Sequence, residues 1–501
     1  MRRGRIADLI YLLPGLMAAT GQAPLNYWWL ALIAWAVAMF GMTQARTWRQ
    51  ATWIGWLVGA GYIAGTHFWI VSPFYIDAET YAWMAPFALA GMVAGLALFF
   101  SAAYAAAFFI GRGPGTRVIA LAVTLITADF LRAWMFTGFP WAQIGSLWLG
   151  QPFMQLASLV GVPGVGLLTL LALAAPMAVT GRARIGTVAA LSLAVLGAGS
   201  IYGLSRLSAP VAETETRIRI VQPNAPQDQK WQPDMAPVFF QRLLDLTETP
   251  AETPPDIVIW PETAVTWRLN IIDELLPVMA DAAGGAELIF GVQRVADGQF
   301  FNSLAVLQPD AEVSQVYDKH RLVPFGEYIP LAGLLAATGI MPDAELRGYT
   351  PGPGARVLDM GDAGLMLPLI CYEAIFARDV AAAPERPDWI MQVTNDAWFG
   401  DSAMPYQHLD QTRLRAIEQG LPVARAANTG VSAMIDPYGR ILDSYPLNEA
   451  GIIDGVLPAP LAETVYSRTG NWPTIVLLVI LFGGLALWRW HGRIDPASTT
   501  T

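Results

Sequence analysis

The stretch LPLICYEAIF (residues 367–376) contains the only cysteine of the 501-residue chain. It belongs to an apolar, strand-like run, Leu365 to Ile370, that ends at Cys371, and Glu373 follows two positions later. A free cysteine often packs as a small hydrophobic residue, so this thiol could be purely structural. A cysteine at the end of a strand could equally be a nucleophile that a neighbouring base activates. The residues elsewhere in the chain must decide between these two interpretations.

Two further polar residues lie at the ends of strand-like runs. Glu262 follows DIVIWP (256–261), and Lys319 lies within VYDKHRLVPFGEYIP (316–330). A thiol with a reference pKa of about 8.5 is mostly protonated at neutral pH, so it needs a base. A carboxylate can take the proton, and a fixed ammonium can stabilise the oxyanion that forms on an attacked carbonyl. If folding brings the three residues together, they could form a thioester on Cys371.

Simpler interpretations exist for these residues too. A glutamate after Trp-Pro is commonly a solvated turn residue, and Lys319 beside Asp318 could be half of a weak surface ion pair. However, the chain has only two lysines, Lys230 and Lys319, among 30 basic residues. A compact ammonium and a planar guanidinium are not interchangeable at a reacting centre, which favours a specific role for Lys319. The sequence suggests no comparable role for Lys230.

The region around these residues, 215–465, is predicted to be a layered α/β domain. HLDQTRLRAIEQG (408–420) is typical of an amphipathic helix that ends at Gly420. VSAMIDPYGRILD (431–443) predicts a hairpin. The other strand-like runs are IRIVQP (218–223), DIVIWP (256–261), ELIFGV (287–292), SLAVLQ (303–308), GLMLPLIC (364–371) and WIMQVT (389–394).

The rest of the chain indicates a membrane protein. Hydrophobic residues make up 54% of the sequence and charged residues only 14%, against roughly 25% charged in soluble domains. Residues 1–205 consist of apolar runs that approach the ~20 residues a spanning helix needs. We expect a membrane domain at 1–205, a final span at 472–488 and a tail at 489–501. The predicted spans are 6–21, 25–42, 51–71, 84–110, 117–136, 160–180, 184–204 and 472–488.

Charge sets the predicted orientation and excludes some partners. Arginines cluster on alternate connections, while the loop with Asp77 and Glu79 has almost no basic residues. By the positive-inside rule both termini are cytoplasmic and residues 215–465 are extracytoplasmic. The net charge of −10 argues against nucleic acid as a partner. The four histidines (67, 320, 408 and 491) are scattered and show no metal-binding spacing, so we expect no metal and no cofactor.

Longer motifs carry a family resemblance. WPETA (260–264), YDKHRLVPFGEYIPL (317–331) and LICYEAIF (369–376) resemble the Glu-Lys-Cys triad regions of the nitrilase superfamily. Together with TNDAWFG (394–400), GFPW (138–141) and the flanking spans, they resemble the bacterial apolipoprotein N-acyltransferases over essentially the whole chain. The resemblance implies about eight helical spans and an extracytoplasmic αββα sandwich of nitrilase type.

The resemblance also implies roles for individual residues. Cys371 would be the acylated nucleophile, Glu262 the general base and Lys319 the oxyanion stabiliser. Glu327 would be a second essential carboxylate that orients Lys319 or the amine substrate. The remaining implied positions are Tyr372 and Glu373 at the cysteine turn, Asn302 in support, and Trp231 and Trp398 at the lipid-binding cleft, although ordinary apolar packing explains Trp398 equally well.

The implied activity is a two-step acyl transfer. A phospholipid, preferably phosphatidylethanolamine, would acylate Cys371, and the N-terminal amine of an S-diacylglyceryl-cysteine apolipoprotein would then take the acyl chain. The enzyme would lie in the bacterial inner membrane, with its catalytic domain in the periplasm and an apolar cleft lined by loops near 325–346 and 398–406. One alternative is a membrane-tethered nitrilase or amidase that hydrolyses small amides. A non-catalytic membrane scaffold or transporter is another alternative. A transporter would favour paired ionisable residues within spans, but the sequence shows only isolated candidates, such as His67 and Asp129.

Overall fold

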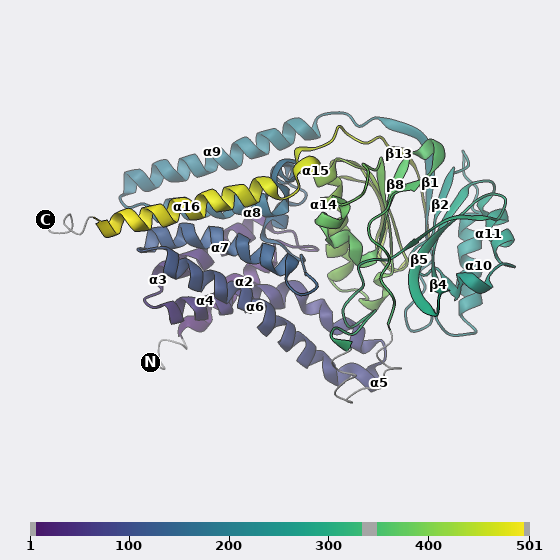
Figure 1. The fold of residues 1–501 in the computed structure, drawn as a ribbon, viewed down its shortest axis with the longest axis horizontal. Coiled ribbons are helices and arrows are strands. Elements are labelled where there is room, and N and C mark those ends of the chain that lie inside the picture. The colour runs from purple at the N-terminus through teal and green to yellow at the C-terminus, as the bar shows by residue number, and fades with distance from the viewer. Residues whose placement is uncertain (1–6, 333–347, 495–501) are drawn as a thin grey trace. The chain divides into compact units, whose positions relative to one another are not determined.

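The computed structural model describes residues 7–332 and 348–494. Its contacts divide the chain into two compact units. The helical unit comprises residues 1–209 and 464–501, and the sheet unit comprises residues 210–463 (Figure 1). The composition change that the sequence shows near residue 210 therefore coincides with a boundary between units.

Small residues let the helices of the helical unit approach closely. Gly61 on α4 lies against α2, where a Cβ atom would meet the backbone of Leu12 and lie 2.9 Å from the nitrogen of Leu16. Helices in membranes commonly pack through such small residues. The α-helices of this unit are α2 (Leu12–Ala19), α3 (Trp28–Gln44), α4 (Trp48–His67), α5 (Ala78–Tyr81), α6 (Ala85–Ile110), α7 (Pro114–Trp134), α8 (Ala157–Ala174), α9 (Arg182–Leu207), α15 (Val465–Thr469) and α16 (Trp472–Ile494). Its 3-10 helices are η1 (Leu9–Tyr11), η2 (Phe68–Tyr75), η3 (Ala82–Met84), η4 (Ile144–Trp148), η5 (Pro152–Leu156) and η6 (Ala175–Ala178).

Six helical segments among the described residues are long and apolar enough to cross a membrane. They coincide with the last six predicted spans. The first two predicted spans, 6–21 and 25–42, correspond to the shorter apolar helices Leu9–Ala19 and Trp28–Gln44. The total of eight crossings therefore stays a prediction. The long segments are Trp48–Tyr75, Ala78–Ile110, Pro114–Trp134, Pro152–Ala178, Arg182–Leu207 and Trp472–Trp490.

The sheet unit contains two sheets that face each other. One has the strand order β13-β1-β2-β4-β5-β6, with β3 beside β4, and the other has the order β12-β11-β10-β9-β8-β7. The strands of the first sheet are β1 (Glu213–Gln222), β2 (Ile257–Ile259), β3 (Val265–Arg268), β4 (Glu287–Ala296), β5 (Gln299–Leu307), β6 (Val313–Asp318) and β13 (Gly451–Pro458). Those of the second are β7 (Leu358–Asp359), β8 (Leu365–Ile370), β9 (Trp389–Thr394), β10 (Val423–Ala427), β11 (Ser432–Ile435) and β12 (Ile441–Tyr445).

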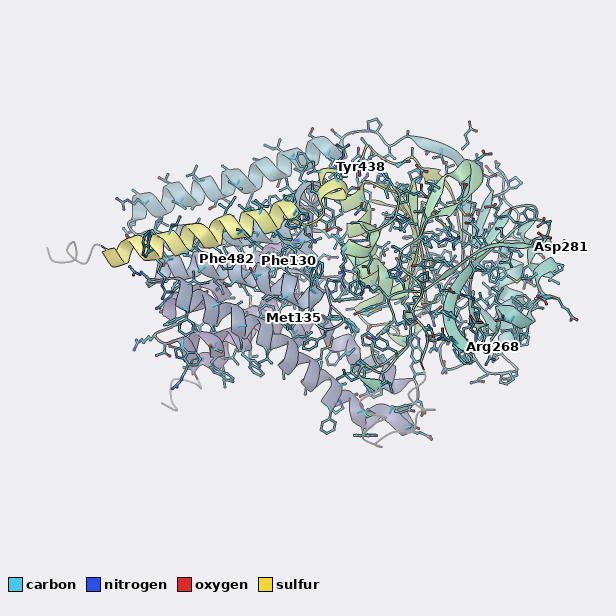
Figure 2. The ribbon with its side chains drawn as sticks, viewed as in Figure 1. Phe130, Met135, Arg268, Asp281, Tyr438 and Phe482 are labelled. Carbon is cyan, nitrogen blue, oxygen red and sulfur yellow. The ribbon has the colours of Figure 1, made fainter. Side chains whose placement is uncertain are left out.

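Helices cover the outer face of each sheet, which gives four layers. Figure 1 shows α10 and α11 beside the first sheet and α14 beside the second. Asp281, labelled in Figure 2, lies on α11 and is exposed on its outer side. This αββα layering is the predicted fold of this unit. The α-helices are α10 (Ala236–Thr247), α11 (Leu276–Ala283), α13 (Ala377–Val380) and α14 (Met404–Gln419), and the 3-10 helices are η7 (Leu269–Ile271), η8 (Gly361–Ala363), η9 (Cys371–Ile375) and η10 (Asp396–Trp398).

Alternation along the strands builds the layers. On β2, Ile257 and Ile259 face the core between the sheets, while Val258 packs under the outer helices. Successive strand residues point to opposite faces, so a continuous apolar run is expected where both faces are buried. This explains why apolar runs such as DIVIWP predicted strands correctly.

The strand directions bring three chain turns to comparable ends of the sheets. β1, β2 and β4 are parallel to one another, and so are β8, β9 and β10. β6 runs parallel to β4, because each is antiparallel to β5 between them. Glu262, Lys319 and Cys371 therefore all lie just beyond the carboxyl ends of their strands.

Candidate active site

Cys371 occupies a sharp turn between β8 and η9. Its φ angle is +52°, a left-handed conformation that few residues other than glycine adopt. Two side chains hold the carbonyl oxygen of Cys371, the Nε2 of Gln392 at 3.2 Å and the Nε2 of His408 at 3.0 Å. Strained backbone of this kind persists only where the surroundings enforce it, and it is common at functional sites. The lone cysteine is therefore presented at a strand end rather than packed within a strand.

Lys319 lies buried between two carboxylates. Its Nζ is 3.2 Å from Oε1 of Glu262 and 2.9 Å from Oε1 of Glu327. The Nδ2 of Asn302 donates to the same two oxygens, at 2.7 Å and 2.9 Å. Asp318 pairs instead with Arg294, at 2.7 Å. The alternative of a surface ion pair between Lys319 and Asp318 is therefore wrong.

Backbone amides fix the outer oxygens of both carboxylates. Oε2 of Glu262 accepts from the nitrogen of Asn395 at 2.8 Å, and Oε2 of Glu327 accepts from the nitrogen of Val323 at 2.8 Å. Glu262 is also buried, so it is not a solvated turn residue. Each carboxylate is held from both sides, which fixes its direction toward Lys319.

The charges of the site favour an ionised base and a neutral thiol. Burial opposes ionisation of Glu262, but Lys319 and the hydrogen bond from Asn302 outweigh it and lower the pKa of Glu262. Burial likewise opposes the charge of Lys319, but Glu262 and Glu327 hold its pKa well above the usual value. Burial and the nearby Glu262 raise the pKa of Cys371. The resting site therefore contains a carboxylate, an ammonium and a protonated thiol.

Glu373 joins the cysteine turn to the segment that bears Lys319. Its buried carboxylate accepts from the nitrogen of Ile370 at 2.7 Å and from the nitrogen of His320 at 2.7 Å. The hydroxyl of Tyr317 donates to it at 3.0 Å. Tyr372 is half-buried, with its ring edge-on to Phe376 at 5.0 Å. Glu373 is thus placed to fix the position of Lys319 relative to Cys371.

A buried ionic cluster lies behind Cys371. The Nδ1 of His408 is 2.9 Å from Oδ1 of Asp396, and Nη2 of Arg425 is 2.7 Å from Oδ2 of the same carboxylate. Arg425 also donates to Gln392 at 2.6 Å. These contacts orient the two side chains that hold the Cys371 carbonyl.

Cys371, Asp396 and His408 also lie close enough to one another to hold a metal ion. However, Asp396 is already bonded to Arg425 and His408, and the Nε2 of His408 faces the carbonyl of Cys371. A metal would have to displace this arginine ion pair. We therefore assign the cluster to positioning of the cysteine turn.

The two tryptophans at the predicted cleft are both part-exposed. Trp231 and Trp398 have 42% and 43% of their surface exposed. Phe325 and Leu331, in the predicted cleft loop near 325–346, are 82% and 74% exposed. Residues 333–347 lie outside the described residues, so the structure describes only residues 325–332 of that loop. Two apolar side chains in the described part of the loop are thus solvent-exposed, while Glu327 between them pairs with Lys319.

Sequence reasoning missed Lys230 and His408. Lys230 is buried, and its Nζ lies 3.2 Å from the carbonyl oxygen of Glu262. The lysine count was the available signal, since both lysines of the chain contact Glu262. His408 was within a correctly predicted helix, but its contact with Cys371 depends on how α14 packs against η9.

Comparison with protein families agrees with this architecture. The model described as apolipoprotein N-acyltransferase N-terminal domain matches residues 14–175. The model described as carbon-nitrogen hydrolase matches residues 217–465. Among solved structures, an amidase from Nesterenkonia sp. AN1 aligns with a TM-score of 0.37 and 19% identity, covering 50% of this chain and 94% of that one. A CN-hydrolase superfamily protein from Xanthomonas campestris aligns with a TM-score of 0.36 and 22% identity, covering 52% and 96%.

Curated relatives align over nearly the whole chain. The apolipoprotein N-acyltransferase of Rhodopseudomonas palustris is 37% identical over 94% of this chain and 93% of its own length. That of Brucella suis is 38% identical over 90% of this chain and 87% of its own length. The chain therefore belongs to the apolipoprotein N-acyltransferase family and carries a nitrilase-type domain on a frame of apolar helices.

Proposed function

We propose that this membrane enzyme transfers an acyl chain from a glycerophospholipid to the N-terminal amine of an S-diacylglyceryl-cysteine apolipoprotein, through a thioester on Cys371. The observation that supports it most directly is the convergence of Glu262, Lys319 and Cys371 from three separate strand ends. The lipoprotein acceptor follows from the name of the relatives, and the phospholipid donor from the need for an acyl ester in the same membrane.

In the first half-reaction, the thiol must lose its proton as it attacks. Glu262 accepts the proton from Sγ, and Sγ bonds to the ester carbonyl carbon of the phospholipid. The ammonium of Lys319 stabilises the oxyanion that forms. When the tetrahedral intermediate collapses, the ester C–O bond breaks, and Glu262 returns the proton to the lysophospholipid alkoxide. The product is a thioester on Cys371.

In the second half-reaction, the neutral amine of the apolipoprotein attacks the thioester carbonyl. An amine proton passes to a carboxylate of the site, the C–S bond breaks, and the thiolate of Cys371 regains a proton. Glu327 is a candidate for this step, because it shares Lys319 and Asn302 with Glu262. The acyl group ends as an amide on the apolipoprotein.

Orientation forms part of the proposal. We infer that residues 215–465 lie on the periplasmic side of the inner membrane, with both termini cytoplasmic. The support is the alternation of arginine-rich connections. Both substrates are anchored in the membrane, so a catalytic domain tethered to it gains from proximity.

Intact-mass spectrometry of the full chain after incubation with phosphatidylethanolamine tests the thioester. We expect the wild type to gain the mass of one acyl chain, and Cys371→Ala to gain none. Cys371→Ser should lose nearly all turnover, because a serine hydroxyl is much harder to deprotonate than a thiol. Wild-type turnover by Cys371→Ser would contradict the proposal.

A second arm of the experiment addresses hydrolysis. The rival amidase function predicts steady release of ammonia from small amides, with water as the second nucleophile. Membership of the N-acyltransferase family favours transfer. Acylation of Cys371 by phospholipid, followed by discharge only when an S-diacylglyceryl-cysteine peptide is added, would exclude the amidase alternative.

A further inference from the structure

Lys230 contacts the turn that bears the proposed base. Only 2% of this residue is exposed. Its Nζ donates to the carbonyl oxygen of Glu262 and to the Oγ1 of Thr263, both at 3.2 Å. Lys319 approaches the carboxylate of Glu262, whereas Lys230 approaches its backbone. The acyl-transfer steps described above make no use of this second ammonium.

The backbone that Lys230 contacts is strained. Thr263 has a φ angle of +45°, and left-handed backbone is a genuine outlier for a β-branched residue. Such a conformation persists only when surrounding groups stabilise it against relaxation. The hydroxyl of Thr263 and the carbonyl of Glu262 both point to the same ammonium, so one cation holds both residues of the turn.

Strand β4 also contacts this turn. Gly291 on β4 donates its backbone N–H to the carbonyl of Pro261 at 3.2 Å. A Cβ atom at Gly291 would lie 2.6 Å from the Cα of Glu262 and closer still to backbone atoms of Pro261 and Thr263. The base-bearing turn is therefore seated against β4, with Lys230 contacting it as well.

The segment of Lys230 also supports the carboxylate itself. Gln227, three residues earlier, accepts from the Nδ2 of Asn395 at 2.8 Å. The backbone nitrogen of Asn395 in turn donates to Oε2 of Glu262 at 2.8 Å. Residues 227–230 thus reach Glu262 by two routes, one through its backbone and one through its side chain.

We propose that Lys230 is a positioning residue for acyl transfer, whose ammonium holds the Glu262–Thr263 turn in its left-handed form and adds positive charge beside the base. The consequence is that the carboxylate stays ionised and in place to take the proton of Cys371. This inference rests on the proposed function, since it assigns Lys230 to the first half-reaction.

Several charged or titratable groups face Glu262. They are Lys319 after β6, Cys371 at the start of η9, and Tyr349. Glu327 pairs with the same Nζ of Lys319 that contacts Glu262. The positive charge of Lys230 lowers the pKa of Glu262, as that of Lys319 does. Burial lowers the pKa of Lys230 itself to about 8, against the opposing effect of Glu262. Removal of the Lys230 charge therefore raises the pKa of Glu262.

The test is the pH dependence of Cys371 acylation in Lys230→Met and Lys230→Arg. The full-length protein is reacted with phosphatidylethanolamine in a single turnover, and the rate of Cys371 acylation is measured. To correct for misfolded protein, this rate is divided by the fraction of natively purified molecules whose single cysteine reacts with a thiol reagent. We expect Lys230→Met to acylate about 10²-fold more slowly, the loss that a small misplacement of a catalytic group can cause. The fall of its acylation rate at low pH, the acid limb of the pH profile, should begin at a higher pH than in the wild type. Lys230→Arg should keep the acid limb of the wild type, because it keeps the charge.

A rescue variant separates the two proposed effects of Lys230, its hydrogen bonds to the turn and its positive charge. Glycine adopts left-handed backbone without strain, so Thr263→Gly should make the turn less dependent on Lys230. We expect the double variant Lys230→Met/Thr263→Gly to acylate at least about tenfold faster than Lys230→Met. This is roughly half of the 10²-fold loss on a logarithmic scale. Its acid limb should remain displaced.

Three results would overturn the inference. One is that Lys230→Met acylates Cys371 with the rate and pH profile of the wild type, once the rate is expressed per reactive molecule. Another is that the loss of rate equals the loss of reactive molecules, which would make Lys230 merely structural. The third is failure of Thr263→Gly to restore any rate. A wild-type protein that takes no acyl group on Cys371 would instead refute the proposed function.

Discussion

In the proposed reaction, the thiol of Cys371 and the carboxylate of Glu262 start in opposite protonation states. Burial and the charge of Glu262 raise the pKa of Cys371, while Lys319 and Asn302 help to lower that of Glu262. A resting thiolate would be exposed to side reactions, whereas a neutral thiol is activated only when an electrophile is in position. Proton transfer and attack are therefore expected to be coupled in this site.

At Lys319, substitution by arginine tests whether charge alone is sufficient. The Nζ lies between Glu262 and Glu327 in a buried site, where the larger guanidinium cannot place a donor at the same point. Loss of one well-placed oxyanion donor costs roughly 10²–10³ in rate. We expect that loss in acyl-enzyme formation, measured by single-turnover labelling, with little change in melting temperature. Near-normal acylation would leave Glu262 and backbone amides as the working groups.

At Glu327, substitution by glutamine separates the two half-reactions. Glutamine retains an oxygen for Lys319 but loses the charge that could accept the amine proton. We expect the acyl-enzyme to form at close to the normal rate and its discharge to a diacylated peptide to slow by about 10²-fold, within the usual range for general base catalysis. Labelling of Cys371 with a radioactive acyl donor, followed by a chase with peptide, measures both steps. Equal loss in both would remove this assignment.

At the scale of elements, two turns that follow strands carry the proposed base and the proposed nucleophile. The turn after β2 bears Glu262 and the turn after β8 bears Cys371, and each includes a left-handed residue other than glycine, Thr263 in the first case. The segment after β6 is held to the second turn by Glu373, through the backbone nitrogens of His320 and Arg321. We expect loss of these hydrogen bonds to shift the proposed reacting groups relative to one another.

The ion pairs of His320 predict a pH-dependent stability. Burial opposes its charge, but Asp379 and Glu373 outweigh burial and raise the pKa of His320 to about 9 from 6.5. A raised folded-state pKa stabilises the fold fully below pH 6.5, and this contribution is lost as pH rises from 6.5 through about 9. Allowing for solvent screening, we expect about 1 kcal/mol, or roughly 2–4 °C in melting temperature.

The matched control is His320→Gln, which has no charge to lose. Thermal unfolding of the full chain in detergent at pH 6 and pH 9.5 compares the two proteins. The wild type should lose more of its melting temperature over this interval than the variant. Parallel losses would show that the His320 pairs contribute nothing to folding.

At the scale of the whole molecule, the lone cysteine makes the predicted topology accessible to experiment. Cys371→Ala is a cysteine-free chain. Single cysteines at Asp77, Arg182 and Asp273, all exposed positions, report on two connections and on the sheet unit. We expect a membrane-impermeant maleimide to label positions 77 and 273 in spheroplasts, and position 182 only after permeabilisation. The inverse pattern would reverse the proposed orientation.

Local pattern was sufficient for much of the architecture. Continuous apolar runs identified β1, β2, β4, β5, β8 and β9, because both faces of these strands are buried. The sequence does not predict the strands β3, β7, β10 and β13, and of β6 it predicts only the end near Lys319. β10 shows the reason, since VARAA carries Arg425, whose charge is satisfied by Asp396 only in the folded protein. In this short strand the single charged residue interrupts the apolar run, whereas the longer run IRIVQP predicts β1 despite its buried Arg219.

The sequence by itself determined the membrane class, the α/β character of residues 215–465 and the proposed trio of Glu262, Lys319 and Cys371. Short-range hydrophobic pattern and motif chemistry carry that information. Only the tertiary structure decided that Lys319 pairs with Glu262 rather than with Asp318. The same holds for the contact of His408 with the Cys371 carbonyl and for that of Lys230 with the Glu262 carbonyl. These contacts join residues from 32 to 57 positions apart. They depend on how strands and helices pack, and no local pattern encodes that packing.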